Sequence, residues 1–226
     1  MPVITMLSPK GGVGKTTTAL ILATTIADQG GDVIMIDADP NFPIARWVAL
    51  GGTPANIEVI QEIDEDEIIA TIDSARKRAP IVIVDLEGRA SARATNALML
   101  SNLVLVPIQG SAIDAAEASR AFRSVRSAAT ARERLLPHAA VLTRTPASDR
   151  LWSKHLRGVV QSLNDAGIPI VKTALAERGA YRDLFSLGGT LAGMDEAVVS
   201  SLAQARINAN NFVADVIALV SGKDRA

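Results

Sequence analysis

Residues 8–17 read Ser-Pro-Lys-Gly-Gly-Val-Gly-Lys-Thr-Thr, and this stretch decides the fold. The apolar run at 3–7 predicts a buried strand, and the segment 16–29, rich in Ala, Leu and Ile, predicts a helix. A glycine-rich turn between a strand and a helix, closed by Lys-Thr, is the pattern of a phosphate-binding loop. Glycines let several backbone N–H groups converge on one anion, and the positive end of the helix adds to their field.

Two lysines belong to this loop. Lys15 is expected to reach the β- and γ-phosphates of ATP, and the Thr16 hydroxyl to hold Mg²⁺. Lys10 is not part of the ordinary motif; a second ammonium there would stabilise charge on the transferred group, as an arginine finger does. The loop residues predicted to bind nucleotide are Gly11, Gly12, Val13, Gly14, Lys15, Thr16 and Thr17, with Thr17 at the α-phosphate.

Three carboxylates follow predicted strands. Asp37 and Asp39 come at the end of the apolar run 33–37, and Asp85 ends the run 81–85. Ligands of a parallel α/β sheet bind beyond the carboxyl ends of its strands, so these side chains are expected beside the phosphate loop. Asp37 and Asp85 are predicted to hold Mg²⁺ or its water ligands, and Asp39 to position the attacking water.

The segment 10–19, Lys-Gly-Gly-Val-Gly-Lys-Thr-Thr-Thr-Ala, resembles the deviant Walker A box of the ParA/MinD group of ATPases. In that family the extra lysine reaches the nucleotide on the other subunit of a dimer, which implies this role for Lys10. The segment 37–40, Asp-Ala-Asp-Pro, resembles the family's second box, whose second aspartate is needed for hydrolysis. The resemblance therefore implies that Lys10, Lys15 and Asp39 are the catalytic residues.

The segment 85–88, Asp-Leu-Glu-Gly, resembles a switch in which the Gly88 amide senses the γ-phosphate. Many partition ATPases have Asp-Thr-Pro-Pro here, so the details of the switch stay open. Glu87 is an alternative catalytic base, although the family pattern favours Asp39. Thr143 and Arg144 stand at the end of a predicted strand, where the family contacts the adenine base.

Aliphatic runs alternate with helical patterns along the whole chain, which predicts a doubly wound α/β fold with a mainly parallel sheet and helices on both faces. We expect one P-loop ATPase domain over 1–226, without an N-terminal DNA-reading domain. The predicted strands are 3–7, 33–37, 57–60, 81–85, 103–108, 139–143 and 170–173. The predicted helices are 16–29, 41–50, 64–78, 91–100, 112–135, 150–166, 179–187 and 195–220.

Composition excludes several classes of protein. The 226 residues are 48% hydrophobic but only 3% aromatic, which predicts an aliphatic core. The sequence has no cysteine, so disulfides and thiolate-bound metal clusters are excluded. No apolar run is long enough to span a membrane, and a strand begins at residue 3, which leaves no room for a signal peptide. We therefore expect a cytoplasmic protein without a membrane partner.

The net charge of −1 hides a basic region between Arg120 and Arg182. Such a region can bind polyanions even in a neutral protein. Arg150, Lys154 and Arg157 are spaced to share one helical face. The candidates for DNA binding are Arg150, Lys154, Arg157, Arg178, Arg182 and Arg206.

The resemblance covers nearly the whole chain. The chain is similar to the small plasmid-partition ATPases of the ParF type and equally to the accessory ATPases of T-DNA transfer. It implies an ATP-dependent homodimer that binds nonspecific DNA on the nucleoid and is reset by Mg²⁺-dependent hydrolysis. A centromere- or border-binding partner protein is expected to stimulate hydrolysis. Plasmid partition is the first interpretation, and an accessory role in T-DNA or conjugative transfer is the alternative.

Two further classes remain open from the sequence. A MinD-like membrane-positioning ATPase needs a basic amphipathic tail, whereas 210–226 is apolar with Lys223 and Arg225 as late charges. Such a strip more often packs in a core. ATP-dependent carboxylases and amidases of cofactor synthesis share the fold, but their loops usually lack Lys-Gly-Gly and no small-substrate site is evident here.

Overall fold

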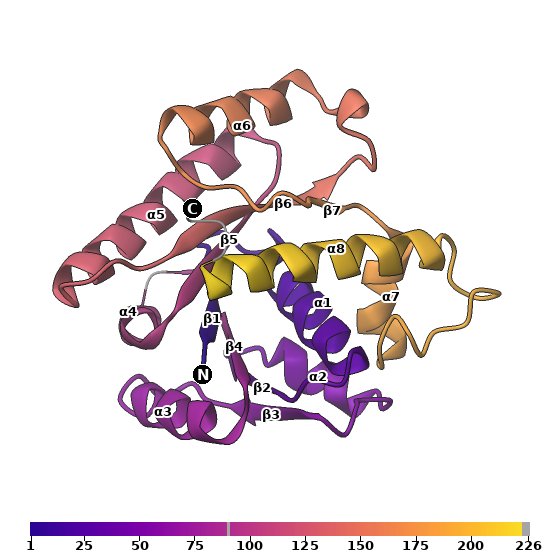
Figure 1. Cartoon of the computed structure of the whole chain (residues 1–226), viewed down its shortest axis with the longest axis horizontal. Helices are drawn as coiled ribbons and strands as arrows, with labels where there is room; N and C mark the ends of the chain where they lie inside the picture. Colours follow the sequence, from indigo (N-terminus) through magenta and orange to yellow (C-terminus); the bar gives the residue numbers. More distant parts are fainter. Residues whose placement is uncertain (90, 223–226) are drawn as a thin grey trace.

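The computed structural model describes residues 1–89 and 91–222, with the backbone alone for 112–115. Within these residues seven strands form one sheet in the order β3-β2-β4-β1-β5-β6-β7, and every neighbouring pair is parallel. The strands are β1 (Val3–Met6), β2 (Val33–Ala38), β3 (Ile57–Gln61), β4 (Ile81–Leu86), β5 (Leu103–Ile108), β6 (His138–Thr145) and β7 (Leu175–Ala176). The doubly wound α/β prediction is confirmed (Figure 1).

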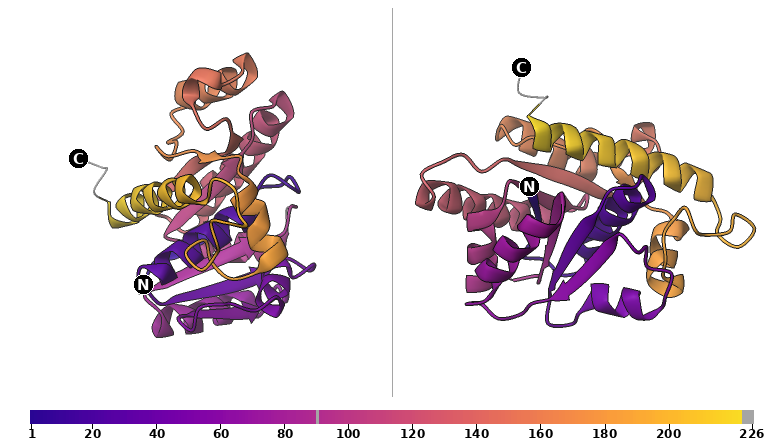
Figure 2. Two further views of the ribbon diagram at one scale, coloured as in Figure 1. Left: turned by 90° about the vertical axis from the view of Figure 1, so that its right-hand side faces the viewer. Right: turned by 60° about the horizontal axis from the view of Figure 1, so that its bottom comes forward.

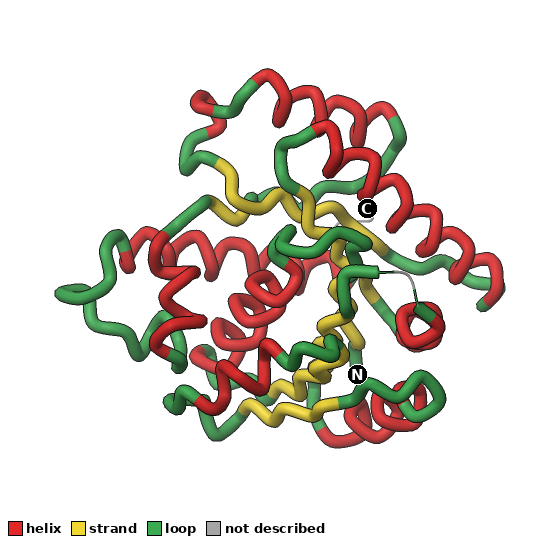
Figure 3. Tube along the Cα trace, turned by 180° about the vertical axis from the view of Figure 1, so that it is seen from behind, coloured by secondary structure: helices red, strands yellow, loops and turns green. Residues whose placement is uncertain are grey.

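Helices connect the strands and cover both faces of the sheet, as the red and yellow segments of Figure 3 show. Their bounds are α1 (Lys15–Asp28), α2 (Pro43–Ala49), α3 (Ile68–Arg78), α4 (Ala92–Leu100), α5 (Ala112–Ala131), α6 (Lys154–Asp165), α7 (Gly179–Leu187) and α8 (Leu202–Ser221). A short 3-10 turn, η1 (Asp149–Leu151), precedes α6.

Two aliphatic cores lie on opposite faces of the sheet because successive strand residues point to opposite sides. In β1, Ile4 and Met6 face the core shared with α1, α2, α7 and α8, whereas Val3 faces the core shared with α3, α4, α5 and α6. Both faces are covered, which explains why the strands read as continuous apolar runs. The sequence order changes direction at β1, so the loop after β1 lies at the topological switch point where ligands bind.

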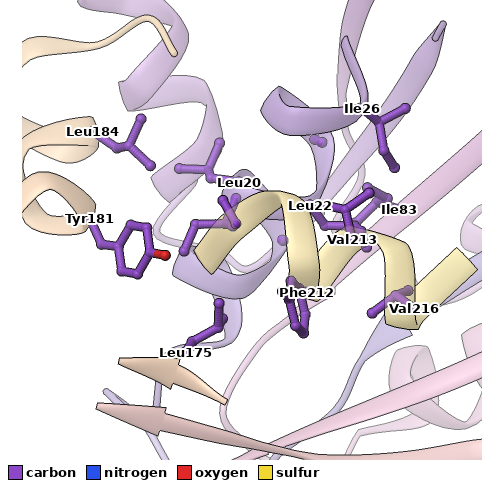
Figure 4. Packing of buried hydrophobic residues seen from close by; sticks show 14 of the residues in the cluster. Leu20, Leu22, Ile26, Ile83, Leu175, Tyr181, Leu184, Phe212, Val213 and Val216 are labelled. Carbon is purple, nitrogen blue, oxygen red and sulfur yellow. The ribbon is translucent and has the colours of Figure 1, made fainter. Parts of the chain in front are cut away.

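The closing helix α8 packs on α1 along the first of these faces (Figure 2). Phe212, Val213 and Val216 are buried in this core, and Figure 4 shows Val213 beside Leu22 of α1. The apolar strip of the tail therefore packs in the core through these residues, with Leu219 and Val220 partly buried against it and Ile217 exposed, and Lys223 and Arg225 lie outside the described residues. Among the helices described, none has the length and hydropathy needed to cross a membrane.

The predicted strand at 170–173 is wrong. This segment touches β6 through one isolated bridge at Ile170, and β7 begins five residues later at Leu175. Side chains of α8 bind the intervening backbone: Asp215 accepts the N–H of Thr173 at 2.8 Å, and Asn208 accepts the N–H of Ala176 at 3.1 Å. The N–H groups of Thr173 and Ala176 are therefore satisfied by side chains of α8, while Val171 donates to the Ala140 carbonyl of β6 at 2.9 Å.

Three helix starts also differ from prediction by four residues or more, and the first is α3, which begins at Ile68 instead of residue 64. Arg150 lies in η1, and α6 begins at Lys154 after the N-cap Ser153, whose hydroxyl accepts the N–H of Leu156. The predicted common helical face for Arg150, Lys154 and Arg157 is therefore wrong. The last helix begins at Leu202 instead of residue 195.

Candidate nucleotide and metal site

The phosphate loop joins β1 to α1 with two glycines in the left-handed region. Gly12 has φ 72° and Gly14 has φ 103°, conformations that other residues adopt only with strain. Gly14 is the N-cap of α1, so the loop N–H groups and the positive helix end face the same space. The sequence pattern and the backbone agree on an anion-binding loop.

Lys15 is buried at the first position of α1, and its ammonium donates to the Lys10 carbonyl at 3.2 Å. Burial lowers the pKa of Lys15, while the charges of Asp85, Asp39 and Glu87 oppose that shift. A buried ammonium surrounded by carboxylates is arranged to receive the negative charge of phosphate groups.

Asp85 and Asp37 end neighbouring strands and are partners in the β2–β4 register. The Thr16 hydroxyl donates to Asp85 Oδ2 at 2.6 Å, and Asp37 Oδ2 accepts the N–H groups of Ile44 and Ala45, each at 2.9 Å. Asp37 therefore caps the start of α2 and is held in place by it.

The other oxygen of each carboxylate, Asp85 Oδ1 and Asp37 Oδ1, is buried without a hydrogen-bond partner among the described residues. Buried polar atoms are rarely left unsatisfied, so each requires a partner. A hydroxyl and two carboxylates are hard oxygen ligands of the kind that Mg²⁺ prefers. Thr16, Asp37 and Asp85 thus fit a magnesium ion or the water molecules around it.

Burial raises the pKa of Asp85 to about 7, although the hydrogen bond from Thr16 and the charge of Lys15 oppose the shift. A carboxyl with a higher pKa in the folded protein than in the unfolded chain binds its proton more tightly when folded, so stability falls as the pH rises. In metal-free protein this loss of stability occurs between the unfolded-state pKa of about 4 and the folded-state pKa of about 7, and it is complete above the folded-state pKa.

We therefore expect Asp85→Asn to stabilise the protein in EDTA near pH 8 by a few kcal/mol, on the order of two to four. The advantage should shrink as the pH is lowered to about 5. Urea unfolding of both proteins across this range measures the difference. A gap that does not change with pH would contradict the assignment of the titration to Asp85.

Asp39 lies just past β2 at the mouth of the site and is half-buried. Its Oδ1 accepts the backbone N–H of Asn41 at 2.8 Å and the side-chain amide at 2.9 Å. These bonds close an Asx turn that fixes the carboxylate without burying it. A carboxylate held in this way can orient a water molecule.

The predicted switch lies against the phosphate loop. A Cβ on Gly88 would come within 3.0 Å of the Gly11 nitrogen and 3.3 Å of the Lys10 carbonyl carbon, so only glycine permits this approach. Glu87 is buried beside it and paired with Arg89 and Arg93. Burial would raise the pKa of Glu87, but the hydrogen bonds from Arg89 and Arg93 outweigh it and hold the pKa below its ordinary value.

Thr143 and Arg144 line a hollow of about 350 Å³ beside the loop, together with Gly14 and Thr17. The Thr143 hydroxyl donates to the Val13 carbonyl at 2.8 Å, so this side chain also supports the loop itself. Arg144 is exposed, with φ 51°. The hollow is of a size to hold a nucleoside next to the phosphates.

The sequence analysis did not predict the opposite wall of this hollow. It is formed by β7 and α7, through Leu175, Ala176, Glu177, Tyr181 and Phe185. Arg178 and Arg182, predicted to bind DNA, line the same wall. The run at 176–182 contributes to this wall, but its two arginines were assigned to DNA binding from charge alone, and charge does not distinguish a nucleotide pocket from a DNA surface.

The other DNA candidates lie elsewhere. Lys154 and Arg157 are exposed on α6, and Arg157 donates to the carbonyls of Trp152, Asp149 and Arg150. Arg206 of α8 pairs with Glu196 at 2.9 Å and donates to the carbonyls of Leu191, Ala192 and Met194. Arg206 therefore fastens the loop before α8. The six candidates are thus distributed over η1, α6, the start of α7, and α8.

A parallel sheet with a two-lysine phosphate loop at its switch point, and aspartates on two neighbouring strands, defines a P-loop ATPase of the ParA/MinD type. The sequence model of the VirC1 protein family matches residues 1–221, and the chain belongs to this family. The Protein ParA of Rhizobium radiobacter is 36% identical over 212 residues, which cover 94% of this chain and 94% of that protein.

Two solved structures show the same fold. The ATP complex of a Cyanothece McdA variant has a TM-score of 0.71 at 17% identity and covers 96% of each chain. MinD of Pyrococcus horikoshii, complexed with Mg-ADP, has a TM-score of 0.70 at 16% identity, covering 97% of this chain and 98% of that chain. The chain is a ParA-like ATPase of the partition and positioning group, and its cofactors are ATP and Mg²⁺.

Proposed function

We propose that this ATPase forms a homodimer around ATP, grips nonspecific DNA as that dimer, and releases it after hydrolysis. The observation that carries the proposal is the placement of Lys10. Its carbonyl accepts from the Lys15 ammonium, and Lys10 lines a second hollow, of about 600 Å³, on the side of the loop away from Thr143 and Arg144. This placement supports a role for Lys10 outside its own nucleotide pocket.

Within one subunit the residues divide the work of hydrolysis. The loop N–H groups and Lys15 bind the phosphates, and Thr16, Asp37 and Asp85 would hold Mg²⁺, which offsets phosphate charge when bound. Asp39 orients the attacking water, and Gly88, packed against Gly11, registers the γ-phosphate. Lys10 of the second subunit stabilises the charge on the transferred group.

DNA binding is proposed for the dimer because the basic candidates are dispersed on one chain. Arg150 and Lys154 are exposed at the start of α6, where they can contact phosphates without reading bases. Arg178 and Arg182 line the nucleotide hollow, which would make their contribution depend on the bound nucleotide. Pairing two copies doubles each basic group and supports binding along a nucleoid.

Retention on random-sequence DNA tests this cycle. We expect retention with ATP and its loss with ADP or in the Lys10→Ala variant. Replacing both Arg150 and Lys154 with alanine should weaken ATP-dependent binding by about tenfold at moderate salt. Lys77→Ala, an exposed lysine on the remote α3, is the matched control and should leave binding unchanged. Equal retention with ATP, with ADP and in Lys10→Ala would refute the switch.

Plasmid partition and an accessory role in DNA transfer remain two uses of this cycle. The 36% identity to ParA favours the first, and the match to the VirC1 family over 1–221 favours the second. In either case we propose that a centromere- or border-binding partner stimulates hydrolysis. The two uses are distinguished by measuring the ATPase rate in the presence of the adjacent-gene product. The rate with duplexes that carry the DNA site of that product is compared with the rate with scrambled duplexes.

A further inference from the structure

The switch carries a buried ion pair that the hydrolytic scheme above does not use. Glu87 follows β4 two residues after Asp85, and its Oε1 accepts from Arg93 Nη2 of α4 at 2.8 Å. Both side chains are nearly inaccessible, with 8% and 6% exposed. Arg89 contacts the other oxygen at 2.8 Å but is 75% exposed. Arg93 is therefore the buried anchor of Glu87, and Arg89 an outer contact.

Arg93 is itself fixed to a third segment. Its Nη1 donates to the carbonyl of Ile63, in the connection between β3 and α3. One turn later on α4, Asn96 donates to the carbonyl of Glu65 in the same connection at 2.8 Å. These two bonds fasten α4 to a neighbouring loop, so the guanidinium is held in place when Glu87 docks on it.

The ion pair adjoins the glycine of the switch, because Gly88 is bonded directly to Glu87. Gly88 follows Glu87 and lies against the backbone of Gly11 and Lys10, where no side chain would fit. A fixed Glu87 side chain fixes this backbone approach. Without Arg93, Glu87 would be a buried carboxylate with one solvent-facing partner, Arg89, and would move toward water.

We propose that Arg93 is a positioning residue for ATP hydrolysis: by holding Glu87 it keeps Gly88 against the phosphate loop, and Glu87 is a structural anion instead of the catalytic base. The inference rests on the ATPase activity of the chain and not on its dimerisation or DNA binding. It gives the departure from the usual partition-ATPase switch sequence a physical reason, because Glu87 and Arg93 form one unit.

Steady-state ATPase kinetics of five variants test the proposal. Glu87→Gln keeps an oxygen for Arg93 and should retain kcat within about threefold. If Glu87 were the catalytic base, the same substitution would lower kcat by about 10²-fold or more. Glu87→Ala and Arg93→Leu should each lower kcat by about tenfold or more, with the Kd for ATP changed by less than about threefold. Arg89→Ala, the exposed matched control, should change kcat by less than about twofold.

The double variant Glu87→Ala with Arg93→Leu should be no slower than the worse single variant, because the two residues act as a unit. Multiplicative losses, or a Glu87→Gln variant as slow as Glu87→Ala, would overturn the proposal. If Arg93→Leu fails to fold, judged by circular dichroism, the comparison of Glu87→Gln with Glu87→Ala decides the question on its own. If the ATPase kinetics of all these variants are as predicted but the wild-type protein is not retained on DNA with ATP, the result would count against the proposed function alone.

Discussion

Asp39→Ala is expected to lower the rate of ATP hydrolysis by about 10²- to 10³-fold while ATP binding changes only a few-fold. Asp39 is half-buried at the mouth of the site and is held by the backbone and side chain of Asn41. It caps no helix, whereas Asp37 caps α2, and it has no hydrogen bond to Thr16, whereas Asp85 does. Its loss should therefore remove the water-orienting group and leave the phosphate and metal contacts intact.

Asp32→Ala is the matched control for Asp39→Ala. Asp32 is exposed and precedes the same strand, β2, at the end of the sheet opposite the site. The Asp32→Ala variant should hydrolyse ATP at the wild-type rate. Phosphate release and equilibrium binding of a fluorescent ATP analogue give the two quantities. An Asp39→Ala variant with unchanged turnover would transfer the hydrolytic role to another residue.

Lys10→Ala is expected to abolish hydrolysis to a comparable degree, about 10²-fold or more, for a different reason. Lys10 lines the hollow beside α4 and α5, on the side of the loop away from the base pocket. A lysine placed there serves a neighbouring subunit better than its own nucleotide. ATP binding to the isolated chain should therefore persist in Lys10→Ala, whereas dimerisation and turnover should fall together.

Mixing two inactive variants distinguishes action across the dimer from action within one subunit. In a dimer of Lys10→Ala with Asp39→Ala, the nucleotide on the Lys10→Ala subunit has its own Asp39 and receives Lys10 from the partner subunit. Each mixed dimer has one complete site, so an equal mixture should recover hydrolysis at about half the wild-type rate per mixed dimer. No recovery, with mixed dimers detected, would place Lys10 in its own site.

Sequence reasoning reached the parts of this molecule that depend on local pattern. The two-lysine loop, the aliphatic strands and the carboxylate at each strand end follow from residue type and spacing, and the parallel sheet brings Asp37 and Asp85 into register. A strand buried on both faces is almost fully apolar, so a carboxylate at its end is conspicuous. The fold was therefore predictable, and so was the placement of Asp37 and Asp85 side by side at the end of the sheet.

The remainder depends on contacts between distant segments. Asp215 and Asn208 of α8 accept the backbone N–H groups of Thr173 and Ala176, and no local pattern in that segment reveals these bonds. Arg206 reads as a surface charge, but the carbonyls of the preceding loop occupy its guanidinium. The pairing of Glu87 with Arg93 likewise needs α4 to be placed beside the switch. These features were accessible only from the three-dimensional arrangement.

The molar mass of the Asp39→Ala variant in solution tests the central proposal most directly. Because this variant should bind ATP without consuming it, sedimentation equilibrium can compare the same protein with Mg-ATP and with Mg-ADP. We predict twice the mass of one chain with ATP, the mass of one chain with ADP, and one chain under both conditions when Lys10→Ala is added. A single chain with ATP bound at saturation would contradict the dimer, and with it the proposed grip on DNA.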